Sequence, residues 1–155
     1  MDYIPPKERW FDDFLVGERF EFGDYLITAE EIVEFAQRYD PQPFHLDAEA
    51  AARSHFGGLI ASGWMSCGVL MRLVCDHFIP SASSMGSPGI DELRWLKPVR
   101  PGDRARAAVE VLAVKPSQSK PDRGVITVQQ ELINQRDDRV LTLVGRGMYQ
   151  RRPAG

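Results

Sequence analysis

The sequence has 155 residues and a formal net charge of −3, with 43% hydrophobic and 26% charged residues. These totals are typical of one soluble globular domain, residues 1–155, that can bury a hydrophobic core. The slight negative charge argues against nucleic acids and anionic membranes as partners, because both are bound through basic surfaces. A phosphate-bearing ligand needs only a local basic cluster and stays compatible with this charge.

Cysteine usage and the amino terminus favour a cytoplasmic protein. Cys67 and Cys75 share one apolar stretch but are too far apart along a helix to bridge, and two buried thiols suit a reducing compartment. The opening sequence MDYIPPKERW lacks the basic-then-apolar pattern of a signal peptide. No apolar run is long enough to span a bilayer.

The amino-terminal third is expected to hold short elements. Residues 1–24 are rich in aromatic residues and predict one short strand near Glu18–Phe22. The sequence Thr28-Ala-Glu-Glu31 predicts a capping box, in which Thr28 caps a helix and Glu31 reaches back to it. This helix is expected to stop before Pro41, since a residue that precedes proline disfavours helix.

Residues 40–46 contain two prolines and are expected to form a rigid loop. Asp47 can then cap a short helix over Ala48–Ser54, which Gly57 and Gly58 end.

The segment Gly63–Phe78 predicts a long central helix. It contains no proline, and Gly68 is its only internal glycine. Its apolar residues cover nearly the whole circumference of a helix, so the helix is expected to be buried on all sides. Other elements must therefore wrap it.

Strand-like runs follow that can supply this wrapping. They are Ile90–Leu96, Arg104–Lys115, Val125–Asn134 and Arg139–Gln150. Their alternation and the turn residues between them predict an antiparallel meander that curls around the helix, an α+β fold.

The segment Asp40-Pro-Gln-Pro-Phe-His45 is the candidate catalytic element. Adding water to an activated double bond requires a base for the water and an acid for the carbon, and Asp40 and His45 suit these tasks. The prolines fix their spacing, and Phe44 can keep the site dry. Taken alone, Asp40 better fits a turn cap before proline, and His45 an ordinary loop histidine.

A second element, Leu59–Trp64, precedes the central helix. Gly63 lies where that helix is expected to begin, and the free N–H groups and positive dipole end there favour a developing negative charge. Gly63 is thus a candidate oxyanion hole, although close packing against a strand would also explain a glycine. Ser62 fits a helix cap and can also hold a water molecule.

These two elements resemble the MaoC-like dehydratase family, which includes the (R)-specific enoyl-CoA hydratases. The resemblance rests on Tyr39-Asp-Pro-Gln-Pro-Phe-His-Leu-Asp-Ala-Glu-Ala-Ala51, on Phe56-Gly-Gly-Leu-Ile-Ala-Ser-Gly63 and on Arg94-Trp-Leu-Lys-Pro-Val-Arg-Pro-Gly-Asp103, and it covers most of the chain. It implies the hot-dog fold, an antiparallel sheet wrapped around a long central helix. It also implies a hydro-lyase of fatty acid metabolism that acts on enoyl-CoA-type thioesters without a cofactor, as a homodimer or larger homo-oligomer.

By the resemblance, the family's catalytic Asp and His fall on Asp40 and His45, its oxyanion-hole glycine on Gly63 and its serine on Ser62. The neighbouring Trp64 is then expected to contact substrate.

Two residues depart from the family motif, since Gln42 replaces an Asn and Tyr39 a Gly. They put substrate and rate in question more than the reaction type. Three alternatives stay open: an acyl-CoA thioesterase, because the fold also hosts these enzymes; a non-catalytic acyl-thioester-binding module; and a structural subunit of a larger complex.

Further residues are candidates for substrate contacts. Trp64, Met65, Met85 and Trp95 are expected to line an acyl pocket. Arg94, Lys97, Arg100, Arg104 and Arg106 can receive CoA phosphates or can simply be solvated surface residues. His55 and His77 are expected at the surface or at an interface, and the absence of Cys or carboxylate clusters at ligand spacing argues against a metal.

Overall fold

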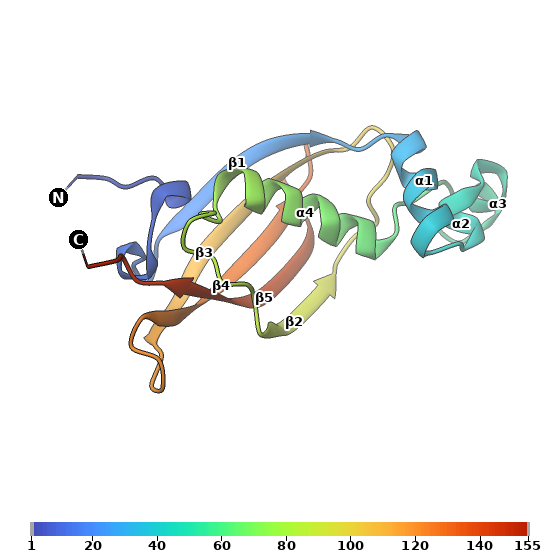
Figure 1. Ribbon diagram of the computed structural model, residues 1–155. Coiled ribbons are helices and arrows are strands. Elements are labelled where there is room, and N and C mark those ends of the chain that lie inside the picture. The colour runs from blue at the N-terminus through green and yellow to red at the C-terminus, as the bar shows by residue number, and fades with distance from the viewer. Residues whose placement is uncertain (1, 155) are drawn as a thin grey trace.

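The computed structural model describes residues 2–154 as one antiparallel sheet packed against one long helix (Figure 1). The strands are β1 (Arg19–Leu26), β2 (Gly89–Trp95), β3 (Arg104–Pro116), β4 (Arg123–Ile133) and β5 (Arg139–Gln150). The helices are α1 (Ala29–Tyr39), α2 (Pro43–Leu46), α3 (Ala48–Arg53) and α4 (Gly63–His77), and the 3-10 turns η1 (Pro6–Glu8) and η2 (Phe11–Asp13) precede β1. Figure 1 shows α4 along the inner face of the sheet, with α1–α3 grouped beyond its amino-terminal end. The predicted α+β arrangement is confirmed.

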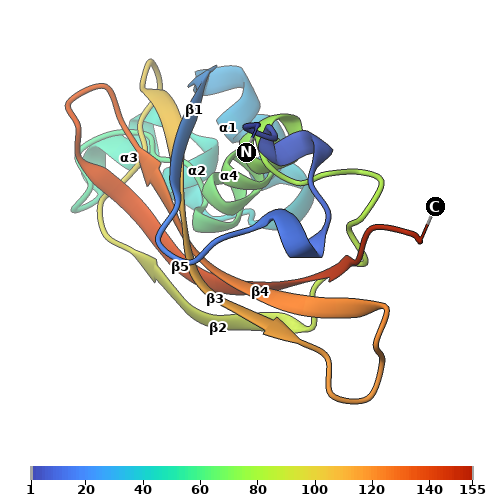
Figure 2. The same cartoon turned by 90° about the vertical axis from the view of Figure 1, so that its left-hand side faces the viewer.

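The sheet order is β1-β3-β4-β5-β2, so the predicted meander is correct only for β3, β4 and β5. β2 pairs with β5 instead of with β3. The connection from β2 to β3 carries Pro98 and Pro101, which do not suit a tight hairpin. It runs past the start of α4, where the Ala61 N–H donates to the Val99 carbonyl at 2.8 Å. The strongly curved sheet thus has β1 and β2 at opposite edges (Figure 2).

The first strand is longer than predicted. β1 continues to Leu26, four residues past the expected end at Phe22. Gly23 takes a φ of +94°, and the register with β3 shifts between Phe22 and Tyr25, so the glycine forms a bulge and does not end the strand. A Cβ atom on Gly23 would lie 2.4 Å from Leu73 Cδ2. The glycine therefore also lets β1 approach α4.

Half of the predicted capping box is present. The Glu31 N–H donates to Thr28 Oγ1 at 3.2 Å, so Thr28 caps α1 as expected. The Glu31 side chain does not reach back to Thr28, because its carboxylate accepts a hydrogen bond from the Tyr25 hydroxyl. That partner comes from β1 and not from the helix itself.

The rigid loop predicted over residues 40–46 is wrong in part, because Pro43–Leu46 forms the helical turn α2. Proline suits the first position of a helix, where its missing N–H would have no partner. Asp47 caps α3 as predicted, with its Oδ1 accepting from the Glu49 N–H at 3.0 Å.

The prediction that α4 is buried on all sides is wrong for one stripe of the helix. The sheet covers the side that carries Val69, Leu70 and Val74. Trp64, Gly68, Met71 and Cys75, here called the open stripe, are exposed, because the sheet curls around only part of the helix. Cys67 is half-buried and Cys75 exposed, so the two thiols are not buried as expected. Within residues 2–154, no helix has the length and apolarity needed to cross a membrane.

Candidate active site

Asp40 and His45 meet at the junction of α1 and α2. Asp40 is the carboxyl-terminal cap of α1, and its N–H donates to the Ala36 carbonyl at 2.9 Å. Pro41 prevents α1 from continuing, and Pro43 starts α2 in a new direction. This turn brings Asp40 Oδ2 to 3.3 Å from His45 Nε2.

A backbone carbonyl orients the imidazole ring of His45. The ring is buried, and His45 Nδ1 lies 2.7 Å from the Ile60 carbonyl oxygen. A carbonyl can only accept, so Nδ1 carries the hydrogen, and in the neutral ring Nε2 presents its lone pair. That lone pair faces Asp40.

Asp40 is held as a carboxylate. Gln42 Nε2 donates to Asp40 Oδ1 at 2.6 Å. Burial raises the pKa of Asp40, but the hydrogen bonds from Gln42 and Ser62, together with the charge of His45 when its ring is protonated, outweigh burial and hold that pKa below its ordinary value. The sequence drew attention to Gln42 only as a departure from the family motif, and the carboxylate it contacts was not foreseen.

The start of α4 lies beside this pair. Ser62 is fully buried and caps the helix, with its Oγ accepting from the Trp64 N–H at 3.2 Å. The Gly63 N–H has no hydrogen-bond partner among residues 2–154, as expected for the first turn of a helix. Asp40, His45 and Gly63 line one cavity of about 390 Å³, here called the smaller cavity.

Gly63 is also required by close packing against β2. A Cβ atom there would lie 2.5 Å from Trp95 Cε2, closer than side chains pack. Trp95 Nε1–H donates to the Gly63 carbonyl at 2.9 Å, and the Trp95 ring meets Trp64 edge-on at a centroid distance of 5.3 Å. Both tryptophans line the smaller cavity.

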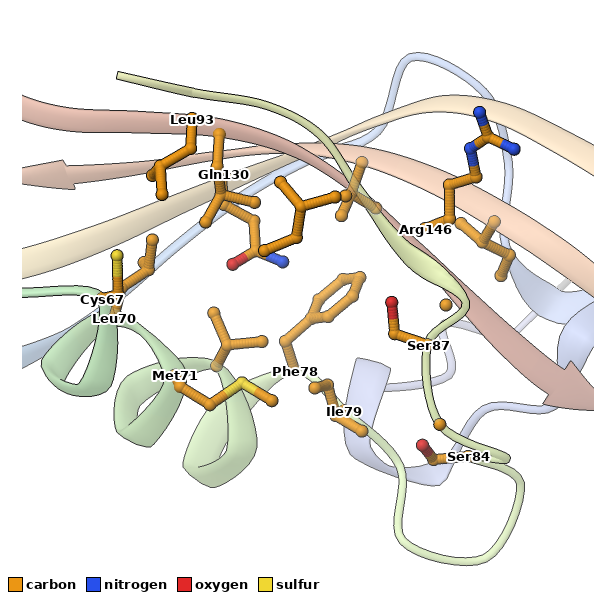
Figure 3. A pocket seen from close by; sticks show the side chains of 18 of the residues that line it. Cys67, Leu70, Met71, Phe78, Ile79, Ser84, Ser87, Leu93, Gln130 and Arg146 are labelled. Carbon is orange, nitrogen blue, oxygen red and sulfur yellow. The ribbon is translucent and has the colours of Figure 1, made fainter. Parts of the chain in front are cut away.

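A larger cavity of about 440 Å³ lies between α4 and the sheet (Figure 3). It is mostly apolar, and Trp64 lines both cavities. Of the residues expected to line an acyl pocket, Met65 and Met85 line neither cavity. Met65 instead faces the core at 3% exposure, and Met85 pairs through its backbone with Met148.

Most of the predicted phosphate-binding cations pair with carboxylates at the surface. The pairs are Arg94–Glu92, Lys97–Asp138, Arg104–Asp24 and Arg106–Asp137. Such exposed pairs are weak and can exchange for a ligand phosphate. Arg100 donates to the Phe56 carbonyl at 2.6 Å. Of the five, Lys97 lines the smaller cavity.

The two remaining histidines lie outside the site. His55 and His77 are exposed, as predicted, and His77 packs against Phe22 at a centroid distance of 5.3 Å. In the described part of the chain, no three His, Cys, Asp or Glu side chains gather as a metal-binding group.

Comparisons with known proteins agree with the fold. The model of the MaoC like domain matches residues 13–134. The 3-hydroxyacyl-thioester dehydratase Z of Mycobacterium tuberculosis is 34% identical over 116 residues, which are 73% of each protein.

Two solved structures show the same fold. A MaoC-like dehydratase from Rhodospirillum rubrum has a TM-score of 0.88 and 41% identity, covering 94% of this chain and 99% of that chain. An (R)-hydratase from A. caviae involved in PHA biosynthesis has a TM-score of 0.69 and 25% identity, covering 90% of this chain and 98% of that chain. The hot-dog fold expected from the sequence is thereby confirmed.

Proposed function

This chain belongs to the MaoC-like dehydratase family, and we propose that it adds water across the 2,3-double bond of an enoyl thioester or removes water from the 3-hydroxyacyl thioester. The observation that carries the proposal is the convergence of Asp40, His45 and the Gly63 N–H on the smaller cavity. The relatives named as a 3-hydroxyacyl-thioester dehydratase and an (R)-hydratase support this reaction type.

Asp40 and His45 act together on one water molecule. The Asp40 carboxylate and the Nε2 lone pair of His45 face the same point, so a water that donates one hydrogen to each fits there. Its oxygen forms the new bond to the β-carbon while one of its O–H bonds breaks. That proton goes to the pair, and the pair delivers a proton to the α-carbon. Dehydration is the reverse.

The thioester oxygen rests on the Gly63 N–H. Addition at the β-carbon makes this oxygen enolate-like, and the unpartnered N–H and the dipole of α4 stabilise the negative charge. Phe44 and Trp95 line the same cavity and limit the access of bulk water. The addition is redox-neutral and uses only side chains, backbone and water, so the proposal includes no cofactor.

The acyl chain extends past Trp64 into the larger cavity. Trp64 lines both cavities, and the walls of the larger one are mostly apolar, as a hydrocarbon chain requires. Lys97 at the smaller cavity is the cation placed to meet a phosphate of the thiol carrier.

The proposed assembly is a homodimer that covers the open stripe of α4 and the β2 edge. Trp64 and Met71 are 59% and 52% exposed, and Ile90 on the unpaired edge of β2 is 57% exposed. Monomers rarely leave several large apolar side chains of this kind exposed near one another, and an unpaired strand edge readily pairs with a second copy.

The deciding experiment measures the loss of the conjugated double bond in a panel of 2-enoyl-CoA thioesters. Wild-type protein is compared with Asp40→Asn, which keeps the size of the side chain but removes the base. We expect turnover in the wild type and a loss on the order of 100-fold or more in Asp40→Asn. Asp47→Asn is the matched control, because it makes the same change at an exposed helix cap outside the cavity.

Full activity in Asp40→Asn would refute the assignment of the base. Release of free CoA with the double bond intact would instead identify hydrolysis of the thioester, and thermal unfolding of both variants shows whether the fold is kept.

A further inference from the structure

Gln130 interrupts an otherwise apolar row on β4. Alternate residues of this central strand face α4, and Ile126, Val128 and Gln130 line the larger cavity while Leu132 lies in the core. An inward position of a central strand beneath a helix is normally apolar. A polar residue there calls for a partner.

The structure gives this side chain no partner from residues 2–154. In that part of the chain every fully buried side-chain nitrogen and oxygen has a hydrogen-bond partner, so the Gln130 amide must be open to the cavity. Figure 3 shows the amide directed into the space between the sheet and α4, on the side where Cys67 and Leu70 lie. It is available to whatever fills the cavity.

We propose that Gln130 selects acyl thioesters whose chain carries an uncharged oxygen, a hydroxyl or a carbonyl, beyond the reacting carbons. This inference rests on the proposed function, since it takes the larger cavity as the acyl site. The amide has both donors and an acceptor and can therefore bind either group. Cys67 lies about 6 Å along α4 from Gly63, one helical turn, so a group that faces Gln130 lies past the carbons next to the thioester.

The charges around the cavity disfavour an acidic substituent. Arg146 is the one charged side chain among the described residues that line the cavity. Its guanidinium already forms a two-bond ion pair with Asp91, with distances of 2.8 and 2.9 Å, and Figure 3 shows it directed away from Gln130. A carboxylate beside Gln130 would be a charge without a partner.

A plain hydrocarbon chain is disfavoured for the opposite reason. It would displace water from the Gln130 amide without replacing the hydrogen bonds that the water made. An uncharged oxygen is the substituent that satisfies the amide without bringing an unpaired charge.

The test measures binding of unreactive pantetheine thioesters, since the pantetheine arm is common to CoA and acyl-carrier protein. Hexanoyl-, 6-hydroxyhexanoyl- and 5-oxohexanoyl-pantetheine are titrated calorimetrically into wild-type protein, Gln130→Leu and Gln129→Leu. We expect the wild type to bind one of the oxygen-bearing chains about 10-fold more tightly than hexanoyl. Gln130→Leu is expected to lose or reverse this preference. Gln129→Leu makes the same change on the opposite face of β4 and is expected to keep it.

Equal or tighter binding of hexanoyl by the wild type would overturn the proposal, as would an unchanged preference in Gln130→Leu. Binding of none of the thioesters would overturn both this inference and the proposed function. The expected preference in a protein that hydrates no enoyl thioester would refute the proposed function alone. Thermal unfolding of Gln130→Leu is measured in parallel to show that the variant folds. Folding is expected, because leucine matches the apolar residues on the same face of β4.

Discussion

Replacing Gly63 by alanine is expected to destabilise the protein, although alanine is the better helix former. A new Cβ atom would lie 2.5 Å from Trp95 Cε2 and 2.6 Å from Trp95 Nε1, so the indole must move. Trp95 then loses its hydrogen bond to the Gly63 carbonyl and its edge contact with Trp64.

The size of the effect is limited because Trp95 is 47% exposed and can swing outward without compressing the core. The lost hydrogen bond is worth about 1 kcal/mol, and the lost aromatic contact about 1 kcal/mol. Alanine returns at most about 1 kcal/mol of helix propensity. We expect Gly63→Ala to lower the free energy of unfolding by about 1 kcal/mol in net terms.

The same substitution is expected to become neutral or stabilising when Trp95 is already alanine, because nothing then occupies the space. Urea unfolding of the wild type, both single variants and the double variant gives the coupling between the two positions, expected at about 2 kcal/mol. An equal effect of Gly63→Ala with and without Trp95 would refute the reasoning. Tryptophan fluorescence of Gly63→Ala reports directly whether the indole has moved.

Two further predictions concern the pair and the assembly. Gln42→Ala removes a hydrogen bond that lowers the pKa of Asp40, so this pKa is expected to rise. The acid limb of the pH profile of kcat/KM then moves to higher pH. If that limb does not move, Asp40 is not the base. Because the pKa of Asp40 is lower in the folded than in the unfolded chain, its carboxylate stabilises the fold above the unfolded pKa. This stabilisation is lost as the pH falls through the folded pKa. It is expected to be smaller in Gln42→Ala, which unfolding measured as a function of pH can show. Met71→Glu places a charge in the open stripe and is expected to weaken the homodimer. The control Glu34→Lys, on an exposed side of α1, is expected to leave the homodimer intact. Analytical ultracentrifugation measures both, and equal dimerisation of the two variants would contradict the proposed interface.

The juxtaposition of Asp40 and His45 could be predicted from sequence because it is local. Both residues lie in one segment in which prolines limit the backbone, and Gly63 follows within the same stretch of chain. The partner of His45 could not be predicted in this way. It is the Ile60 backbone carbonyl, and a backbone carbonyl carries no residue-type signal.

Contacts that depend on tertiary packing were also missed or mistaken. Glu31 has the spacing of a capping box, but the Tyr25 hydroxyl from β1 competes for its carboxylate. The composition of α4 indicates how much apolar surface must be covered and not which element covers it. The sequence therefore does not predict the open stripe, and the prediction that Met65 lines a pocket is wrong because Met65 faces the core.

Both ends of the described chain lie at the end of the molecule remote from α1 and α2 (Figure 1). Arg151 contacts Asp12 and Arg152 donates to Asp13 at 2.7 Å, which holds the carboxyl-terminal segment against η2. Attachment of a fluorescent protein, or of a solid support, through either end therefore leaves the smaller cavity facing the medium. The same geometry makes the protein suitable for immobilised biocatalysis, because the tether and the substrate approach from opposite sides.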